Sequence, residues 1–199
     1  WKLTKKGNYY YYQDRKYKIK LNTQNVYSKG MFENVCLAIK VALDLNIDKK
    51  IIQKTLPLLS FEGRFQFLTK GKIKNKLSRN ETIMIDGAHA TTDAKNLASY
   101  LKEIKVPKYG IWAMTKNKEP DLFIKQLKGI FKKIVTIPIK NELNSVPADE
   151  LYKVATKNKF NAVKSDNFAQ ALKKISSEEK KLIVCFGSLY NCGSILNKN

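Results

Sequence analysis

The chain has 199 residues, of which 43% are hydrophobic and 11% aromatic, so it indicates one folded domain with room for a fragment of another and argues against disorder. No run approaches the roughly 20 apolar residues that cross a bilayer, and the first residues lack a signal peptide, so we expect a soluble, cytoplasmic protein with no membrane partner. The net charge of +21 suggests a polyanion, but the lysines are scattered and only three basic residues are arginine, which argues against nucleic acid as partner.

The N-terminal part of the chain predicts a small block of strands and helices. Its β-prone runs are separated by a polar turn, and apolar residues at helical spacing follow them. The expected elements are strands at 9–12 and 17–21, a helix at 32–46, and a short helix capped by Asp48 that ends at Pro57.

From Ile83 onward, short apolar runs alternate with amphipathic stretches, the pattern of a parallel sheet with helices on its faces. The expected strands are 83–85, 109–113, 133–137, 162–163 and 182–186. The expected helices are 92–104, 120–131, 148–157, 166–176 and one after Ser188. Ligands bind where the strands of such sheets end, which directs attention to residues 86–89, 115–119 and 187–188.

The cysteines do not predict a metal or redox site. Cys36, Cys185 and Cys192 are odd in number, lack the spacing of metal ligands and lie in apolar surroundings, so we expect inert core thiols. His89 is the only histidine, which makes a mixed histidine and cysteine cluster hard to assemble. The sequence therefore predicts no bound metal.

Two motifs flank the first strand of the predicted sheet. Arg64 lies in the preceding FEGRFQ segment, and the strand ends in a carboxylate, a glycine and an imidazole, Asp86, Gly87 and His89. An arginine can pair with a nucleotide, a strand-end aspartate can accept bonds from ribose hydroxyls, and a histidine before a helix can bind an anion or transfer a proton. A simple turn, with Asp86 as a cap and His89 on the surface, is the alternative.

These motifs carry a resemblance. Residues 63–65 (GRF) followed by residues 86–89 (DGAH) resemble the junction into the C-terminal domain of folylpolyglutamate and dihydrofolate synthases, members of the Mur ligase superfamily. Residues 117–119 (NKE) look like a degraded Asp-Lys-Asp of that family, and residues 187–190 (GSLY) match its Gly-Ser-Leu-Tyr. Residues 30–38 resemble the Gly-x-His-Gln-x-x-Asn helix that closes its central domain.

The resemblance implies a fold and a domain organisation. It implies an α/β fold with a Rossmann-like sheet of about five to six mostly parallel strands flanked by helices, preceded by a small α+β remnant. Residues 1–57 would be the remnant of the central ATPase domain, residues 58–82 the linker or hinge, and residues 83–199 the C-terminal glutamate-ligase-type domain.

The resemblance also implies an activity. Family members use ATP and Mg to add L-glutamate to a folate or dihydropteroate carboxylate through an acyl phosphate. By resemblance, the nucleotide would be bound by Arg64, Asp86 and Lys118, the catalytic residue would be His89, and glutamate or phosphate would be bound by Gly187 and Ser188. For Ser188, a helix cap is the alternative, and both roles can hold together.

Departures from the family pattern put the activity in doubt. Ala90 and Thr91 stand where the family has Asn-Pro, and Met31 and Phe32 replace its His-Gln pair. The phosphate-binding motif Gly-x-x-Gly-Lys-Ser/Thr is absent from the sequence. We therefore expect this chain to be inactive alone and to need an N-terminal ATPase half, missing or separate. A non-catalytic remnant of a decaying gene and a basic nucleic-acid-binding module are the alternatives.

Overall fold

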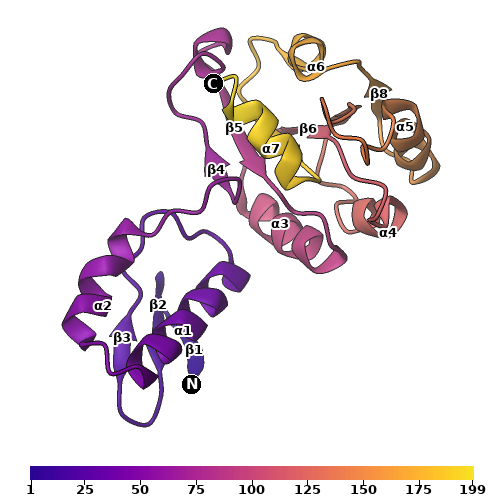
Figure 1. Cartoon of the computed structure of the whole chain (residues 1–199). Helices are drawn as coiled ribbons and strands as arrows, with labels where there is room; N and C mark the ends of the chain where they lie inside the picture. The colour runs from indigo at the N-terminus through magenta and orange to yellow at the C-terminus, as the bar shows by residue number, and fades with distance from the viewer. The chain divides into compact units, whose positions relative to one another are not determined.

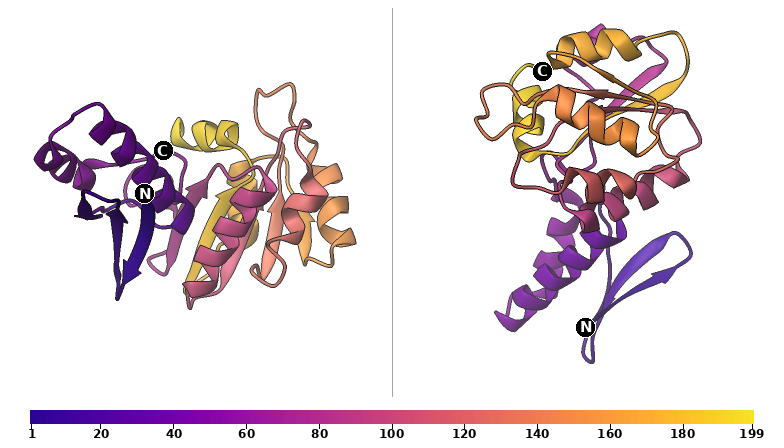
Figure 2. Two further views of the ribbon diagram at one scale, coloured as in Figure 1. Left: turned by 90° about the horizontal axis from the view of Figure 1, so that it is seen from below. Right: turned by 90° about the vertical axis from the view of Figure 1, so that its right-hand side faces the viewer.

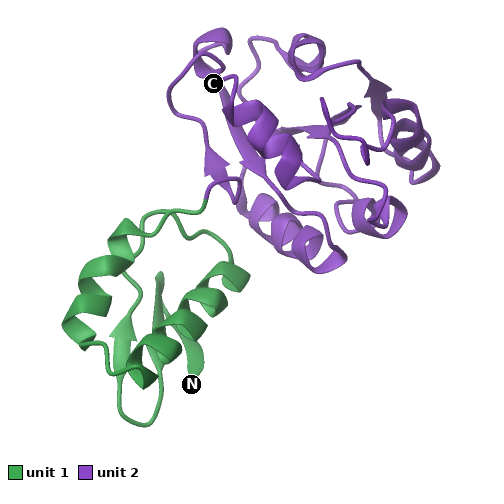
Figure 3. Cartoon of the chain, in the orientation of Figure 1, with its two compact units in different colours: residues 1–61 green, residues 62–199 purple.

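The computed structural model describes residues 1–199 and divides them into two compact units, residues 1–61 and residues 62–199 (Figure 3). None of its helices has both the length and the apolar character that crossing a membrane requires.

The N-terminal unit combines a three-stranded antiparallel sheet with two helices (Figure 1). Its elements are β1 (Lys2–Lys6), β2 (Tyr9–Gln13), β3 (Lys18–Lys20), α1 (Lys29–Asp44), α2 (Lys49–Thr55) and the short 3₁₀ helix η1 (Leu56–Leu58). The side chain of Asp48 accepts from the Lys50 N–H at 2.6 Å, so the predicted cap of α2 is confirmed. Helix α1 begins three residues before its expected start, because Ser28 caps it through the Met31 N–H.

The C-terminal unit is built on a six-stranded sheet with the order β4-β5-β9-β6-β7-β8. Its strands are β4 (Gln66–Phe67), β5 (Glu81–Asp86), β6 (Lys108–Trp112), β7 (Lys133–Thr136), β8 (Ala162–Lys164) and β9 (Lys181–Phe186). The pairs among β5, β9, β6, β7 and β8 are all parallel, whereas β4 is an antiparallel edge strand. The predicted fold class and all five predicted strands of this sheet are confirmed.

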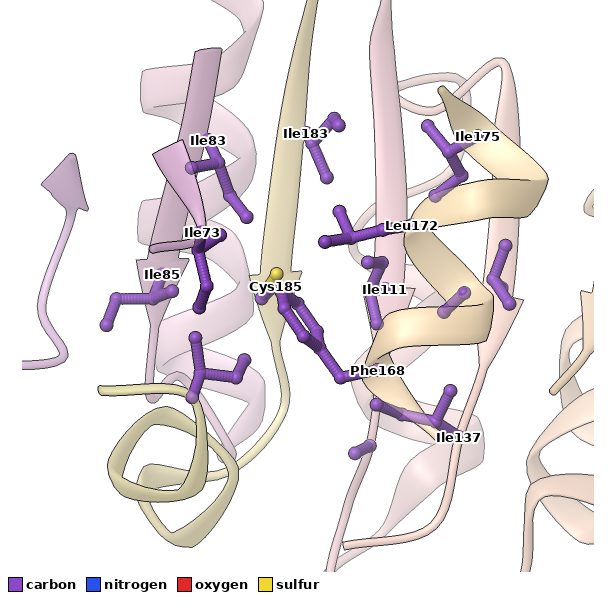
Figure 4. Packing of buried hydrophobic residues seen from close by; sticks show 14 of the residues in the cluster. Ile73, Ile83, Ile85, Ile111, Ile137, Phe168, Leu172, Ile175, Ile183 and Cys185 are labelled. Atoms are coloured by element: carbon purple, nitrogen blue, oxygen red, sulfur yellow. The ribbon is translucent and has the colours of Figure 1, made fainter. Parts of the chain in front are cut away.

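Helices cover both faces of this sheet (Figure 2). The helices are α3 (Thr91–Glu103), α4 (Pro120–Lys125), α5 (Ala148–Lys157), α6 (Phe168–Ile175) and α7 (Leu189–Leu196), with a 3₁₀ turn η2 (Lys74–Lys76). Residues of α6 and α7 share one core with alternate strand residues such as Ile183 and Cys185 (Figure 4). On the opposite face Trp112 and Phe186 stack on Phe123 of α4. Strands that are buried on both faces explain the continuous apolar runs of the sequence.

One predicted helix is shorter than expected. Helix α4 was expected to extend to residue 131, but it ends at Lys125 and turns follow it. Gly129 lies in this segment with a φ of +76°, a left-handed backbone that a helix cannot contain. The apolar residues Leu127 and Ile130 are buried all the same, which explains why their spacing imitates a helix.

The cysteines are part of the two cores. All three are buried and unpaired, as predicted. Burial raises the pKa of Cys36 to about 11 and that of Cys192 to about 12, and it holds the pKa of Cys185 well above its ordinary value. At neutral pH these side chains are therefore thiols, which suits core packing and not nucleophilic chemistry.

Candidate functional site

The candidate site lies at the carboxyl edge of the sheet, where three neighbouring strands end in register. Asp86 of β5 is opposite Phe186 of β9, and Trp112 of β6 is opposite the same residue. Because these strands are parallel, the segments that follow them start at one edge. Residues 86–89 and 187–188, to which the sequence directed attention, therefore lie at the same end of the sheet.

Asp86 is almost completely buried, and both of its carboxylate oxygens accept hydrogen bonds from the backbone. One oxygen takes the Phe65 N–H and the other the Ala88 N–H, each at 2.8 Å. Burial raises the pKa of Asp86 from 3.8 to about 6, although the two hydrogen bonds and the charge of Arg64 act to lower it. The carboxylate thus joins the segment before β4 to the turn after β5, and a role in nucleotide binding stays a prediction.

The segment that carries Arg64 is clamped against this turn. Gly63 and Phe65 on either side of it have left-handed φ angles of +67° and +47°, and such a backbone is costly for an aromatic residue. Its cost is offset by the Asp86 bond and by a second bond, from the Gly87 N–H to the Gly63 carbonyl at 2.6 Å. Arg64 is half-buried, and it is close enough for its charge to lower the pKa of Asp86.

His89 is held in one tautomer by the same turn. Its Nδ1 lies 2.8 Å from the Gly87 carbonyl oxygen, and a carbonyl can only accept, so Nδ1 carries the proton. In the neutral ring Nε2 is then left as an acceptor. The backbone N–H groups of His89 and Ala90 both point to Asp93 at 3.3 Å, which fixes the start of α3. The imidazole is thus positioned at the sheet edge with its basic nitrogen unused by the turn.

The segment after β9 packs against both neighbouring turns. A Cβ at Gly187, where φ is +104°, would overlap the Ala113 carbonyl oxygen, so the chain here passes directly against the end of β6. A Cβ at Gly87 would overlap Leu189. The Ser188 hydroxyl accepts from the Tyr190 N–H at 3.1 Å, so Ser188 is the N-cap of α7. The contact that Ser188 makes in this structure is therefore that of a helix cap, the alternative to ligand binding.

Lys118 lies apart from the other candidates in its contacts. It follows β6, and its N–H bonds the Thr115 carbonyl at 3.2 Å, which places it in a turn near the same edge. Within residues 1–199 no hydrogen bond or ion pair joins its side chain to Arg64, Asp86, His89 or Ser188. Across the same residues, no group of three or more His, Cys, Asp or Glu side chains is close enough to hold a metal ion.

Two contributors to this edge carry weak signals in the sequence. Leu189 fills the space above Gly87, and Asp93 fixes the entry to α3. An acidic residue three positions into a helix is a common capping signal, so Asp93 could have been identified from its spacing. The left-handed conformation of Phe65 could not have been predicted from the sequence, because phenylalanine rarely adopts it.

A mostly parallel sheet with helices on both faces defines an open α/β domain, a class in which ligands bind at the carboxyl ends of the strands. A family model described as "Dihydrofolate synthetase, C-terminal domain" matches residues 69–198. The chain belongs to this family, so the predicted resemblance is confirmed. Comparison with curated protein sequences gives no match.

Solved structures share the fold. E. coli FolC in complex with DHPP and ADP has a TM-score of 0.77 at 16% identity, over 98% of this chain and 44% of that one. Mycobacterium tuberculosis folylpolyglutamate synthase complexed with ADP and AMPPCP has 0.73 at 17%, over 86% and 40%. The bifunctional folylpolyglutamate synthase/dihydrofolate synthase of Yersinia pestis, complexed with AMPPNP and Mn ion, has 0.74 at 15%, over 94% and 43%. This chain thus spans less than half the length of these proteins.

Proposed function

We propose that this chain is the C-terminal part of an ATP-dependent ligase that joins L-glutamate to a folate or dihydropteroate carboxylate through an acyl phosphate. Its family membership supports this reaction class. The observation that carries the proposal is that the turn at Gly87 packs against Leu189. Leu189 directly follows Gly187 and Ser188 in the chain. This packing brings a histidine and a helix N-terminus, two groups suited to an amine and an anion, to one edge.

Each candidate residue has a role in this proposal that its geometry permits. His89 would accept a proton or a hydrogen bond at Nε2, because Nδ1 is engaged by Gly87. The N-terminus of α7 at Gly187 and Ser188 would receive a carboxylate or phosphate oxygen. Asp86 would act by holding the segment of Arg64 in place, since both of its oxygens are used by backbone donors.

ATP with Mg would supply the phosphoryl group that activates the carboxylate. From this chain Arg64 and Lys118 would face the nucleotide, since they are the cationic candidates at the sheet edge. No cluster of side chains in residues 1–199 is suited to a metal ion, so we propose that the ATPase half of the ligase holds Mg. The same half would provide the phosphate-binding loop that this sequence lacks.

A surface of the N-terminal unit supports the need for that half. Leu37, Val41 and Leu45 lie on the exposed side of α1, with 52%, 51% and 70% of their surface accessible. Next to them, α1 and α2 enclose an apolar groove of about 400 Å³ that includes Ile51. Exposed apolar patches of this kind mark interaction surfaces. Because the solved structures are more than twice as long as this chain, we propose that the ATPase half packs here.

Complementation tests this proposal. The purified chain is mixed or co-expressed with the ATPase half of a related ligase, and ATP-dependent incorporation of labelled glutamate into dihydropteroate or tetrahydrofolate is measured. We expect no incorporation by the chain alone and measurable incorporation by the complex. His89→Ala should lower the rate about 100-fold, whereas Lys128→Glu, a distant surface change, should not.

Two results would contradict the proposal in different ways. Incorporation by the chain alone would refute the need for a partner. An intact complex without incorporation would favour the non-catalytic remnant. Val41→Glu separates assembly from chemistry, because it should prevent the complex from forming while leaving the sheet edge unchanged.

A further inference from the structure

The face of the sheet covered by α6 and α7 holds a cavity of about 840 Å³. Both helices are eight residues long, and residues of each line the cavity. Figure 4 shows the Phe168 ring reaching from the start of α6 toward Cys185 of β9. The apolar part of the cavity wall includes Ile73, Leu77, Ile137, Phe168, Leu172 and Ile195. None of the residues assigned to the ligase site lines it.

The charged part of the wall is dominated by lysine. Lys76, Lys140, Lys173 and Lys198 line the cavity, and each is exposed. None of the four forms an ion pair, whereas other lysines of this unit do, as Lys164 does with Asp149 at 2.6 Å. Asp166 is the only acidic residue in the wall. Four unneutralised cations around an apolar cavity create a positive potential that attracts anions.

A buried amide in the same wall lacks a partner. Asn191 of α7 is only 3% exposed and lines the cavity, and its Nδ2 is buried without a hydrogen-bond acceptor. An unsatisfied buried donor destabilises a fold, and native proteins have few of them. Rotation of the amide about its last bond lets either of its polar atoms face the cavity. Asn191 is therefore available to a ligand that brings a hydrogen-bonding group into this space.

We propose that this cavity binds an organic anion with an apolar body, such as an aromatic or branched aliphatic carboxylate. The apolar body would pack between α6 and α7, a polar oxygen would meet Asn191, and the negative group would face the lysines. The volume is within the range of roughly 300 to 1,000 Å³ typical of small-molecule sites. This site goes beyond the ligase chemistry and does not depend on it.

A matched pair of probes tests the site on the full chain. 1-Anilinonaphthalene-8-sulfonate carries an aromatic body and a negative charge, and N-phenyl-1-naphthylamine has the same body without the charge. We expect the sulfonate to bind more tightly than the neutral amine, by a margin that shrinks as salt is added. Lys140→Glu and Lys198→Glu should each weaken sulfonate binding about 3- to 10-fold, and Asp166→Asn should strengthen it about 2-fold.

Two control variants locate the binding. Lys128→Glu makes the same charge change away from the cavity and should leave the affinity unchanged. Ile51→Lys places a charge in the apolar groove of the N-terminal unit and should also leave it unchanged. An affinity that falls in Ile51→Lys and not in the two cavity lysine variants would place the probe elsewhere and overturn the proposal.

Asn191 provides a second measurement that distinguishes a binding group from a structural one. Asn191→Leu replaces an unpaired polar group by an apolar side chain of similar size. The unfolding temperature of the free protein should therefore stay level or rise. Sulfonate binding should nevertheless weaken about 5-fold, the loss of one hydrogen bond. Unchanged binding in this variant or in the lysine variants would overturn the proposal, as would equal affinity for the neutral amine.

Discussion

The two ends of β5 and β9 each contain a buried charge, but they hold it differently. At the amino end, Glu81 and Lys181 are 0% and 1% exposed, and their charged atoms lie 3.6 Å apart. Glu81 also accepts from the Ser78 and Ser177 N–H groups and the Ser176 hydroxyl, and Lys181 donates to the Ile175 carbonyl. At the carboxyl end, Asp86 forms no ion pair and accepts two backbone N–H groups.

This difference suggests that the charges at the amino end stabilise the fold, whereas the charge at the carboxyl end can respond to a ligand. A buried pair with its hydrogen bonds satisfied has little to gain from any additional ligand, so the amino end serves the fold. A buried carboxylate whose pKa is raised to about 6 is held by the fold at a cost, and a nearby cation can lower that cost. Ligand binding is therefore expected to act at the carboxyl end, where Arg64 already lowers the pKa of Asp86.

The largest effect is expected from breaking the pair at the amino end. Glu81→Gln or Lys181→Met leaves one buried charge without its partner and should lower the free energy of unfolding by about 3 to 5 kcal/mol. The double variant removes both charges and should recover most of that loss. Urea unfolding of the three variants measures the effects. Additive losses in the double variant would show that the two charges do not stabilise one another.

The charge at the carboxyl end should make stability fall as pH rises. The folded chain keeps the Asp86 proton up to about pH 6, whereas the unfolded chain releases it near 3.8. Between these values the folded state binds more protons, so the free energy of unfolding decreases by about 3 kcal/mol and then stays level. Asp86→Asn should abolish this decrease, as seen from urea unfolding between pH 4 and 7.

Asp149 gives a control of opposite sign for that experiment. Hydrogen bonds from Lys164 and Lys153 lower its pKa to about 2, so its stabilisation is present above about pH 4 and is lost as pH falls toward 2. Asp149→Asn should leave the range between pH 4 and 6 unchanged. A wild-type chain and an Asp86→Asn variant with parallel stability curves would contradict the raised pKa of Asp86.

Glycines of the carboxyl end offer a smaller, purely steric contrast. Gly187→Ala forces a left-handed alanine onto the Ala113 carbonyl and should cost about 2 to 3 kcal/mol. Gly193, inside α7, has no atom near its missing side chain, so Gly193→Ala should stabilise by up to about 1 kcal/mol. Thermal unfolding measures both. Equal effects would mean that the close approach at Gly187 does not constrain the edge.

The sequence predicted those elements whose residues repeat a pattern. The parallel strands are short apolar runs, and Asp48 is a residue type that commonly caps the N-terminus of a helix, as it does for α2. Strand β1 escaped prediction because Lys2, Thr4 and their neighbours are mostly polar, and its pairing with the tyrosines of β2 holds it in place. Strand β4 contains only two residues and exists through pairing with β5. Strands that form mainly because a neighbouring strand pairs with them cannot be recognised from their own residues.

The site was predictable to the level of segments and not of contacts. Parallel strand ends bring residues 86–89 and 187–188 to one edge whatever their side chains do. That Asp86 turns inward to the backbone depends on the left-handed Phe65, whose N–H would otherwise point elsewhere. Conformations of this kind are fixed by tertiary contacts, so no local pattern reveals them.

The smallest expected effect separates the two roles of Ser188, helix cap and ligand group. Ser188→Ala removes the acceptor for the Tyr190 N–H and should cost about 1 kcal/mol in thermal unfolding. Ser188→Asp keeps a strong N-cap and places a negative charge at the positive end of α7, so its stability should stay within about 0.5 kcal/mol of the wild type. The same carboxylate would repel a glutamate carboxylate or a phosphate from the helix N-terminus. In the complex with an ATPase half, Ser188→Asp should therefore lose glutamate incorporation while it keeps its fold.

If Ser188 is only a helix cap, Ser188→Asp should instead incorporate glutamate at least as well as Ser188→Ala.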